Sequence, residues 1–84
     1  MSTQVEKTAY QMFIEMGFKK DVWGALIIYE RKTDMITERV GFHRLNKRYY
    51  VQALVGNNDV LRSEVETGLH KAIHQQMKEL GWIK

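Results

Sequence analysis

Two segments of the chain end in the same way, with an apolar residue, a glycine and an aromatic residue. The first ends Met16-Gly17-Phe18 and the second ends Leu80-Gly81-Trp82. A glycine in this place reaches positive φ without a Cβ clash, and the residue after it packs back onto the last helical turn. Both segments therefore predict a helix closed by a left-handed glycine cap. Because the two helices bracket a central segment with strand-like patterns, the chain is constrained to helix, strands, helix.

Both predicted helices carry an apolar stripe at helical spacing. The first is expected to begin at Thr3, with Glu6 completing a capping box, and the second has Ser63 with Glu66 as its candidate box. Gln76 interrupts the second stripe, and we interpret it as a hydrogen-bonded core amide or the edge of an interface rather than as a catalytic group. The stripe residues are Val5, Ala9, Met12, Phe13 and Met16 in the first helix and Leu69, Ile73, Met77 and Leu80 in the second.

Three segments between the helices have the composition of strands, at residues 23–31, 36–43 and 48–55. The first is apolar on both sides, and the other two alternate. The turn between the last two lies within residues 44–47, where Asn46 is the natural residue for positive φ. An even number of turn residues gives a consistent apolar face. That face consists of Ile36, Val40, Phe42, Tyr49, Val51, Ala53 and Val55.

These patterns predict one small α+β domain over residues 1–84. Its order is α-β-β-β-α, a three-stranded antiparallel meander with two helices packed on one face. Glu38 falls on the predicted core face, where an unpaired carboxylate is costly. We therefore expect Glu38 to lie near a sheet edge or to pair with a basic side chain.

Sequence motifs for chemistry are few. The only serines, Ser2 and Ser63, stand at expected helix starts, where capping explains them. His70 and His74 are spaced i, i+4, but the glutamate of a zinc-protease helix is missing, and surface histidines are the simpler interpretation. The chain has no cysteine, which excludes disulfides and cysteine-based zinc sites. We expect no catalytic residues, no metal and no cofactor, and hence not an enzyme.

The first predicted strand has more apolar residues than one helical layer can cover. Either the set containing Leu26 and Ile28 or the opposite set is left exposed, unless the N-terminal segment or a helix folds over it. An exposed apolar face predicts a partner surface, most simply a second copy of the chain. The candidate interface residues are Trp23, Ala25, Ile27 and Tyr29.

The second predicted hairpin carries the basic excess. The chain has a formal net charge of +3, and residues 35–55 contain four basic residues against one acidic residue. Cations interleaved with aromatic rings on a sheet are suited to nucleic acid, although a solvated hairpin of a basic protein has the same composition. The candidate residues are Arg39, His43, Arg44, Lys47, Arg48 and Tyr50.

Several short stretches of the chain also support a likeness. They are Phe13-Ile14-Glu15-Met16-Gly17-Phe18, Ile27-Ile28-Tyr29-Glu30, Gly41-Phe42-His43, Lys47-Arg48-Tyr49-Tyr50, Ala72-Ile73 and Glu79-Leu80-Gly81-Trp82. In these stretches, and over most of its length, the chain resembles small uncharacterised proteins encoded by phages and prophages of Gram-positive bacteria. The resemblance implies expression from a mobile element in a bacterial cytoplasm, and it implies no functional residues.

The sequence therefore favours a non-enzymatic phage or prophage accessory protein that binds another protein, with a homodimer as the simplest case. The alternative is a nucleic-acid-binding accessory protein that uses the basic second hairpin. No membrane segment is expected, because the chain has no run of 18 apolar residues. A small-molecule substrate is not expected either.

Overall fold

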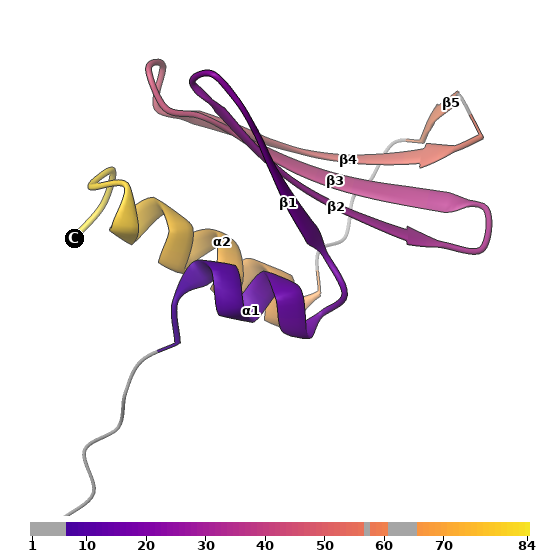
Figure 1. Cartoon of the computed structure of the whole chain (residues 1–84), viewed down its shortest axis with the longest axis horizontal. Coiled ribbons are helices and arrows are strands. Elements are labelled where there is room, and N and C mark those ends of the chain that lie inside the picture. Colours follow the sequence, from indigo (N-terminus) through magenta and orange to yellow (C-terminus); the bar gives the residue numbers. More distant parts are fainter. Residues whose placement is uncertain (1–6, 57, 61–65) are drawn as a thin grey trace, which may run out of the picture.

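The computed structural model describes residues 7–56, 58–60 and 66–84. Within these residues, five antiparallel strands form one sheet in the order β1-β2-β3-β4-β5, and two helices lie on one of its faces (Figure 1). None of the described helices is long and apolar enough to span a bilayer. The elements are α1 (Ala9–Glu15), β1 (Lys19–Trp23), β2 (Leu26–Thr33), β3 (Ile36–His43), β4 (Arg48–Val55), β5 (Asn58–Val60) and α2 (Thr67–Glu79).

The two glycine caps are confirmed. Gly17 has φ +93° and Gly81 has φ +78°. At each end the aromatic N–H donates to the carbonyl oxygen five residues back, Phe18 to Phe13 at 3.0 Å and Trp82 to Met77 at 2.9 Å. The glycine N–H donates to the carbonyl oxygen three residues back, which completes a Schellman motif at both helix ends.

The predicted helix starts differ from those observed. α1 begins at Ala9, and Thr8 caps it in a reciprocal box with Gln11, at 3.1 Å and 2.9 Å. Thr3 and Glu6 lie outside the described residues. α2 begins at Thr67, and its N-cap residue Glu66 makes no side-chain capping bond. Ser63 also lies outside the described residues.

The three-stranded prediction is wrong because it missed the hairpin formed by β1 and β2. Gly24, at φ +59°, begins a two-residue turn that pairs Trp23 with Leu26. Glycine at the first turn position is what a type II′ hairpin favours. The extended run predicted for residues 23–31 is therefore split, and the charged segment before it becomes an edge strand. β5 adds a short fifth strand beside β4.

The predicted register of β3 and β4 is confirmed. The turn has four residues, 44–47, and pairs Val40 with Val51 and Phe42 with Tyr49. The residue with positive φ in this turn is Lys47 rather than Asn46. The side chains of Val40, Phe42 and Ala53 are buried under the helices, as the alternating pattern predicted.

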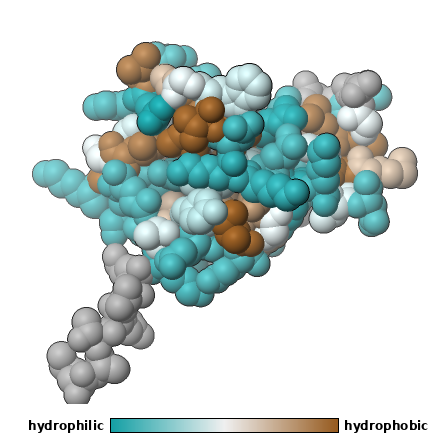
Figure 2. All heavy atoms as spheres, in the orientation of Figure 1, coloured by the Kyte–Doolittle hydropathy of each residue, from teal (hydrophilic) through white to brown (hydrophobic). Residues whose placement is uncertain are grey.

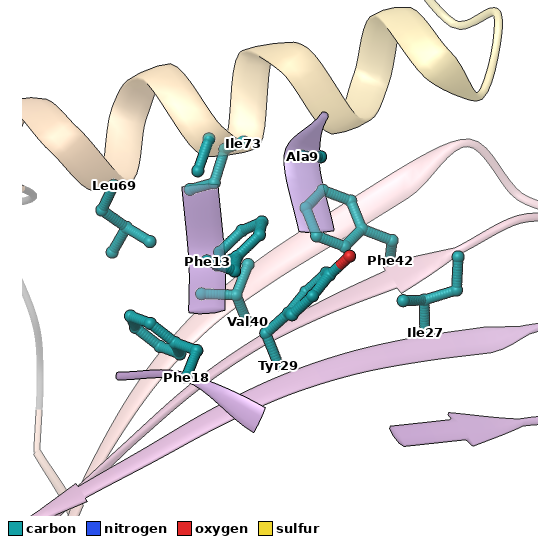
Figure 3. Packing of buried hydrophobic residues seen from close by; sticks show 10 residues of the cluster. Ala9, Phe13, Phe18, Ile27, Tyr29, Val40, Phe42, Leu69 and Ile73 are labelled. Carbon is teal, nitrogen blue, oxygen red and sulfur yellow. The ribbon is translucent and has the colours of Figure 1, made fainter. Parts of the chain in front are cut away.

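Aromatic rings form the centre of the core (Figure 3). The Phe13 ring of α1 stacks on the Tyr29 ring of β2 with their centroids 3.8 Å apart, and Phe42 meets both edge-on. Leu69 of α2 is also buried here. The sheet thus gains its hydrophobic cover from both helices, and three rings from α1, β2 and β3 fix how these elements pack.

The interface predicted for the first apolar strand is wrong in its central residues. Ile27 is 6% exposed and Tyr29 is fully buried, because this is the face that the helices cover. Ala25 is half-buried in the β1–β2 turn, and Trp23 remains exposed on the opposite face of the sheet. Ile27→Glu is therefore expected to unfold the chain rather than to separate a dimer.

Arg31 joins both helices to the covered face. Its guanidinium donates to the Glu38 carboxylate at 2.6 Å and 3.0 Å, to the Met16 carbonyl oxygen at 2.9 Å and to Glu66 at 3.0 Å. It also lies 4.5 Å from the centre of the Phe18 ring. Burial lowers the pKa of Arg31, but its hydrogen bonds to Glu38 and Glu66 outweigh this and raise the pKa above its ordinary value.

Glu38 is thus paired with a base, which was one of the two expected solutions. The other expected position, near a sheet edge, is wrong, because β3 is the middle strand of the sheet.

The interpretation of Gln76 as a satisfied core amide is confirmed, since its Oε1 accepts the Tyr29 hydroxyl proton at 2.8 Å. Desolvation and the negative charge of Glu79 raise the pKa of Tyr29 to about 12.

Candidate binding surface on the open face of the sheet

The face of the sheet opposite the helices, here called the open face, is ordered in rows by the antiparallel register. Paired residues point to the same side, so each row crosses the strands from β1 to β4. The row nearest the β1–β2 turn is Trp23, Leu26, His43 and Arg48, the next is Asp21, Ile28, Gly41 and Tyr50, and the third is Lys19, Glu30, Arg39 and Gln52.

The first two rows contain an aromatic patch, defined as Trp23, Leu26, Ile28, His43 and Tyr50. Leu26, Ile28 and Tyr50 are half-buried, and His43 is exposed. The rings of His43 and Tyr50 lie 6.1 Å apart. The patch therefore combines two aliphatic side chains with three rings, on a face that no described helix covers.

Gly41 is required by the close approach of Tyr50. A Cβ at Gly41 would lie 2.2 Å from a carbon of the Tyr50 ring, a distance that real Cβ contacts do not reach. The ring thus lies directly over the glycine in the centre of the sheet.

Trp23 is the exposed indole of the patch, with 67% of its surface accessible. Its indole Nε1–H donates to Oδ2 of Asp21 at 2.8 Å, and Oδ1 of the same carboxylate accepts the Val22 N–H at 2.9 Å. A large exposed side chain would otherwise sample several rotamers. Asp21 therefore acts as a positioning residue that holds the indole on the open face.

The third row is a polar ladder, defined as Lys19, Glu30, Arg39 and Gln52. Arg39 donates to Oε2 of Glu30 at 2.7 Å and 2.9 Å, and a longer bond of 3.4 Å reaches Gln52. The pair is about one-third exposed. Because the Arg39 guanidinium and the Glu30 carboxylate lie side by side, the polar ladder offers hydrogen-bond donors next to an acceptor.

A cavity of about 510 Å³ lies where the patch meets the ladder on the β1 side. Its lining residues from the open face are Lys19, Asp21, Trp23, Ile28, Glu30 and Arg39. Trp23 and Ile28 supply apolar walls, and the other four supply charge. Figure 2, which has the orientation of Figure 1, shows a mostly hydrophilic surface over β1 and α1.

The turn between β3 and β4 lies beside the β1–β2 turn. Arg44 donates through its side chain to the carbonyl oxygens of Gly24 and Ala25, and its N–H donates to Ala25 at 2.9 Å. Lys47, in the same turn, and Arg48, at the start of β4, are exposed. Basic side chains thus border the aromatic patch at the end of the sheet.

The six residues proposed for nucleic acid fall into two groups. Arg39, His43, Arg48 and Tyr50 lie on the open face, whereas Arg44 and Lys47 lie in the adjoining turn. Two of the bases are already engaged, Arg39 with Glu30 and Arg44 with backbone carbonyls. The three rows and the turn at residues 44–47 contain two acidic residues, Asp21 and Glu30, and five basic residues, which are Lys19, Arg39, Arg44, Lys47 and Arg48.

The sequence pattern left Leu26 and Ile28 as one of two sets that could be exposed, but it did not predict β1 as part of this surface. Leu26, Ile28 and Trp23 were assigned to strand faces as though residues 23–31 were continuous. Gly24 was the available signal, because a glycine inside an apolar run marks a turn or bulge. Recognising that turn would have placed Trp23 opposite Leu26, on the same face of the sheet.

Other polar side chains gather on the outer surface of the helices. His70, Lys71, His74 and Lys78 border a cavity of about 360 Å³ beside Met12. Among the described residues, no three histidine, aspartate or glutamate side chains lie close enough together to hold a metal ion.

Comparison of the chain with protein-family models, with curated proteins and with solved structures gave no match.

Proposed function

We propose that the protein is a non-enzymatic binding protein that takes single-stranded nucleic acid on its open face. The observation that carries the proposal is the aromatic patch with its border of basic side chains, on a sheet face that the helices leave uncovered. Successive bases stack on exposed rings, and the cations follow the phosphate backbone. The predicted hairpin residues thus contribute to a larger surface that also includes Trp23, Leu26 and Ile28.

The form of this surface favours a single strand over a duplex. Trp23 and Tyr50 lie on separate strands of the sheet and in neighbouring rows. A ring on a sheet can stack only on a base whose face is open, and in a duplex the bases stack on one another. Duplex binding would use the cations alone and would be weaker and more sensitive to salt.

A direct test measures the fluorescence anisotropy of a labelled single strand of about 12 nucleotides and of its duplex, at low and physiological salt. The single strand is expected to bind more tightly, and its affinity should fall as salt rises. Trp23→Ala is expected to weaken binding by about 1–3 kcal/mol. Tyr10→Ala is the matched control, because Tyr10 is a half-exposed ring on α1.

A second pair of variants tests the charge border. Arg48→Gln should weaken binding and flatten its salt dependence, whereas Lys71→Gln, on the exposed side of α2, should change neither. Absence of binding at low salt, or equal losses in Arg48→Gln and Lys71→Gln, would contradict the proposal.

Self-association is a second candidate function, and it is supported by the other end of the sheet. The β2–β3 hairpin reaches beyond both helices (Figure 1), and Met35 at its turn is 75% exposed beside the exposed Ile36. Figure 2 shows hydrophobic atoms at this end. Light scattering of the wild type and of Met35→Ser tests it: a dimer that the substitution weakens would support the idea, and a monomer at all concentrations would oppose it.

A further inference from the structure

The cavity beside Trp23 has a more specific character than the rest of the open face. Its volume, about 510 Å³, lies within the range of small-molecule sites. One wall is the indole of Trp23, which Asp21 holds by a 2.8 Å hydrogen bond. The side chain of Ile28, which crosses the sheet from Asp21, adds an apolar surface. The indole and the aliphatic side chain thus offer surfaces on which a planar ring can stack.

The polar side of the cavity offers an acceptor next to donors. Both hydrogen bonds from Arg39 to Glu30 end on Oε2, so the other oxygen, Oε1, takes no part in this ion pair. The Arg39 guanidinium keeps further N–H groups, since within the described part of the chain Nη1 makes only a long contact of 3.4 Å with Gln52. The pair can therefore accept from one edge of a ring and donate to the neighbouring position.

We propose that this cavity is a base-binding pocket with a preference for guanine, an inference that rests on the proposed function. Guanine carries N–H donors at N1 and N2 next to an acceptor at O6, and N7 is a further acceptor. A carboxylate accepts from the donors, and arginine donates to O6 or N7. Trp23 stacks on the face of the base, Glu30 accepts from N1 and N2, and Arg39 donates to O6.

The other bases match this arrangement less well. Adenine has one exocyclic donor beside an unprotonated ring nitrogen, which would face the Glu30 carboxylate with a lone pair. Cytosine and thymine are single rings and cover less of the indole. Lys19, which also lines the cavity, would meet the phosphate of the same nucleotide.

The test compares labelled oligothymidine octamers that carry one central guanine, adenine, cytosine or inosine, by anisotropy with the folded full chain. The guanine octamer is expected to bind about tenfold more tightly than all-thymine, because a well-placed base contact discriminates by about 1–3 kcal/mol. Inosine, which lacks the 2-amino group, should lose part of the preference. This comparison needs no protein variant.

Glu30→Gln should reduce the tenfold preference to near unity, because the amide cannot accept from two adjacent donors. Glu15→Gln is the matched control, since it removes one negative charge from the exposed Lys7–Glu15 pair on α1. Circular dichroism of both variants establishes that they are folded.

Equal binding of all octamers, or a guanine preference that survives in Glu30→Gln, would overturn the proposal of a guanine pocket. Either result would leave the proposal of single-strand binding intact. No binding of any octamer would overturn the proposed function itself. The two failures are therefore distinguishable.

Discussion

Two ion pairs on neighbouring rungs between β2 and β3 have the same chemistry and opposite surroundings. Glu30 pairs with Arg39 on the open face, and Arg31 pairs with Glu38 on the covered face. The first pair is about one-third exposed, whereas the side chains of the second are 18% and 9% exposed. Since one residue along a strand moves a side chain to the other face, the same two strands supply one ion pair under the helices and one on the open face, and we propose that the second takes part in binding.

The surroundings decide what each pair contributes. On the covered face, Arg31 also bonds the end of α1 and the start of α2, so its loss would break its bonds to Glu38, Met16 and Glu66 together. On the open face, water can replace either partner. The covered pair is thus expected to govern stability, and the open pair to govern recognition.

The largest effect is expected for Arg31→Met, which removes the buried cation and keeps most of the side-chain length. The substitution breaks the bond to Glu38, whose side chain is 9% exposed, and breaking a buried ion pair costs about 3–5 kcal/mol. Urea unfolding followed by circular dichroism measures the loss. A cost under about 1 kcal/mol, as for a surface pair, would contradict the distinction between the two faces.

The next effect concerns Tyr29, whose phenol lies in the covered core. Its pKa is raised from 10.0 to about 12, so the folded state holds this proton more tightly than the unfolded state does. The stabilisation is fully present below pH 10 and is lost as pH rises from 10 through 12, by about 2–3 kcal/mol in total. Urea unfolding at neutral pH and at about pH 11 measures it.

Tyr29→Phe provides the control for this pH effect, because it removes the titrating group and keeps the ring stacked on Phe13. The variant should lose less stability than the wild type between the two pH values. Parallel losses in both proteins would show that other groups cause the alkaline unfolding.

A smaller effect is expected for Gly41→Ala on the open face. The new Cβ would meet the Tyr50 ring and force it aside, at the lower end of the cost of overpacking, about 1–3 kcal/mol. The double variant Gly41→Ala with Tyr50→Ala should regain stability relative to Gly41→Ala with Tyr50 present. Additive losses in thermal unfolding would mean that the ring does not lie over the glycine.

The smallest effect is expected for Arg39→Met, the open-face counterpart of Arg31→Met. Partly exposed ion pairs contribute about 0–1 kcal/mol, so urea unfolding should change little. The same variant should nevertheless weaken oligonucleotide binding. A stability loss as large as that of Arg31→Met would remove the contrast between the two rungs.

Much of the fold was predictable because local rules and tertiary structure agree. The caps at Gly17 and Gly81 need only a residue that tolerates positive φ and an aromatic neighbour. The faces of β3 and β4 follow from alternation and an even turn. In these segments the spacing alone leaves one consistent arrangement.

The other parts of the fold could not be predicted, because the spacing of apolar residues does not determine them. Residues 23–31 are apolar on both sides, so alternation could not indicate which face the helices cover, and the assignment of Ile27 and Tyr29 to an interface was wrong. Lys19-Lys20-Asp21 has a charged composition typical of a loop, yet it pairs with β2 once Gly24 turns the chain. The partners of Arg31 are distant in sequence, and only the packing of both helices brings them together.

The most direct test uses the two tryptophan indole N–H signals in a ¹⁵N NMR titration with a guanine-containing single strand. Trp23 lies on the open face, whereas Trp82 lies on the covered side, with its ring 6.1 Å from that of Phe42. Each signal therefore reports on one face of the sheet within a single sample. Binding on the open face predicts that the Trp23 signal moves and the Trp82 signal stays. Movement of Trp82 alone, or of neither, would contradict it.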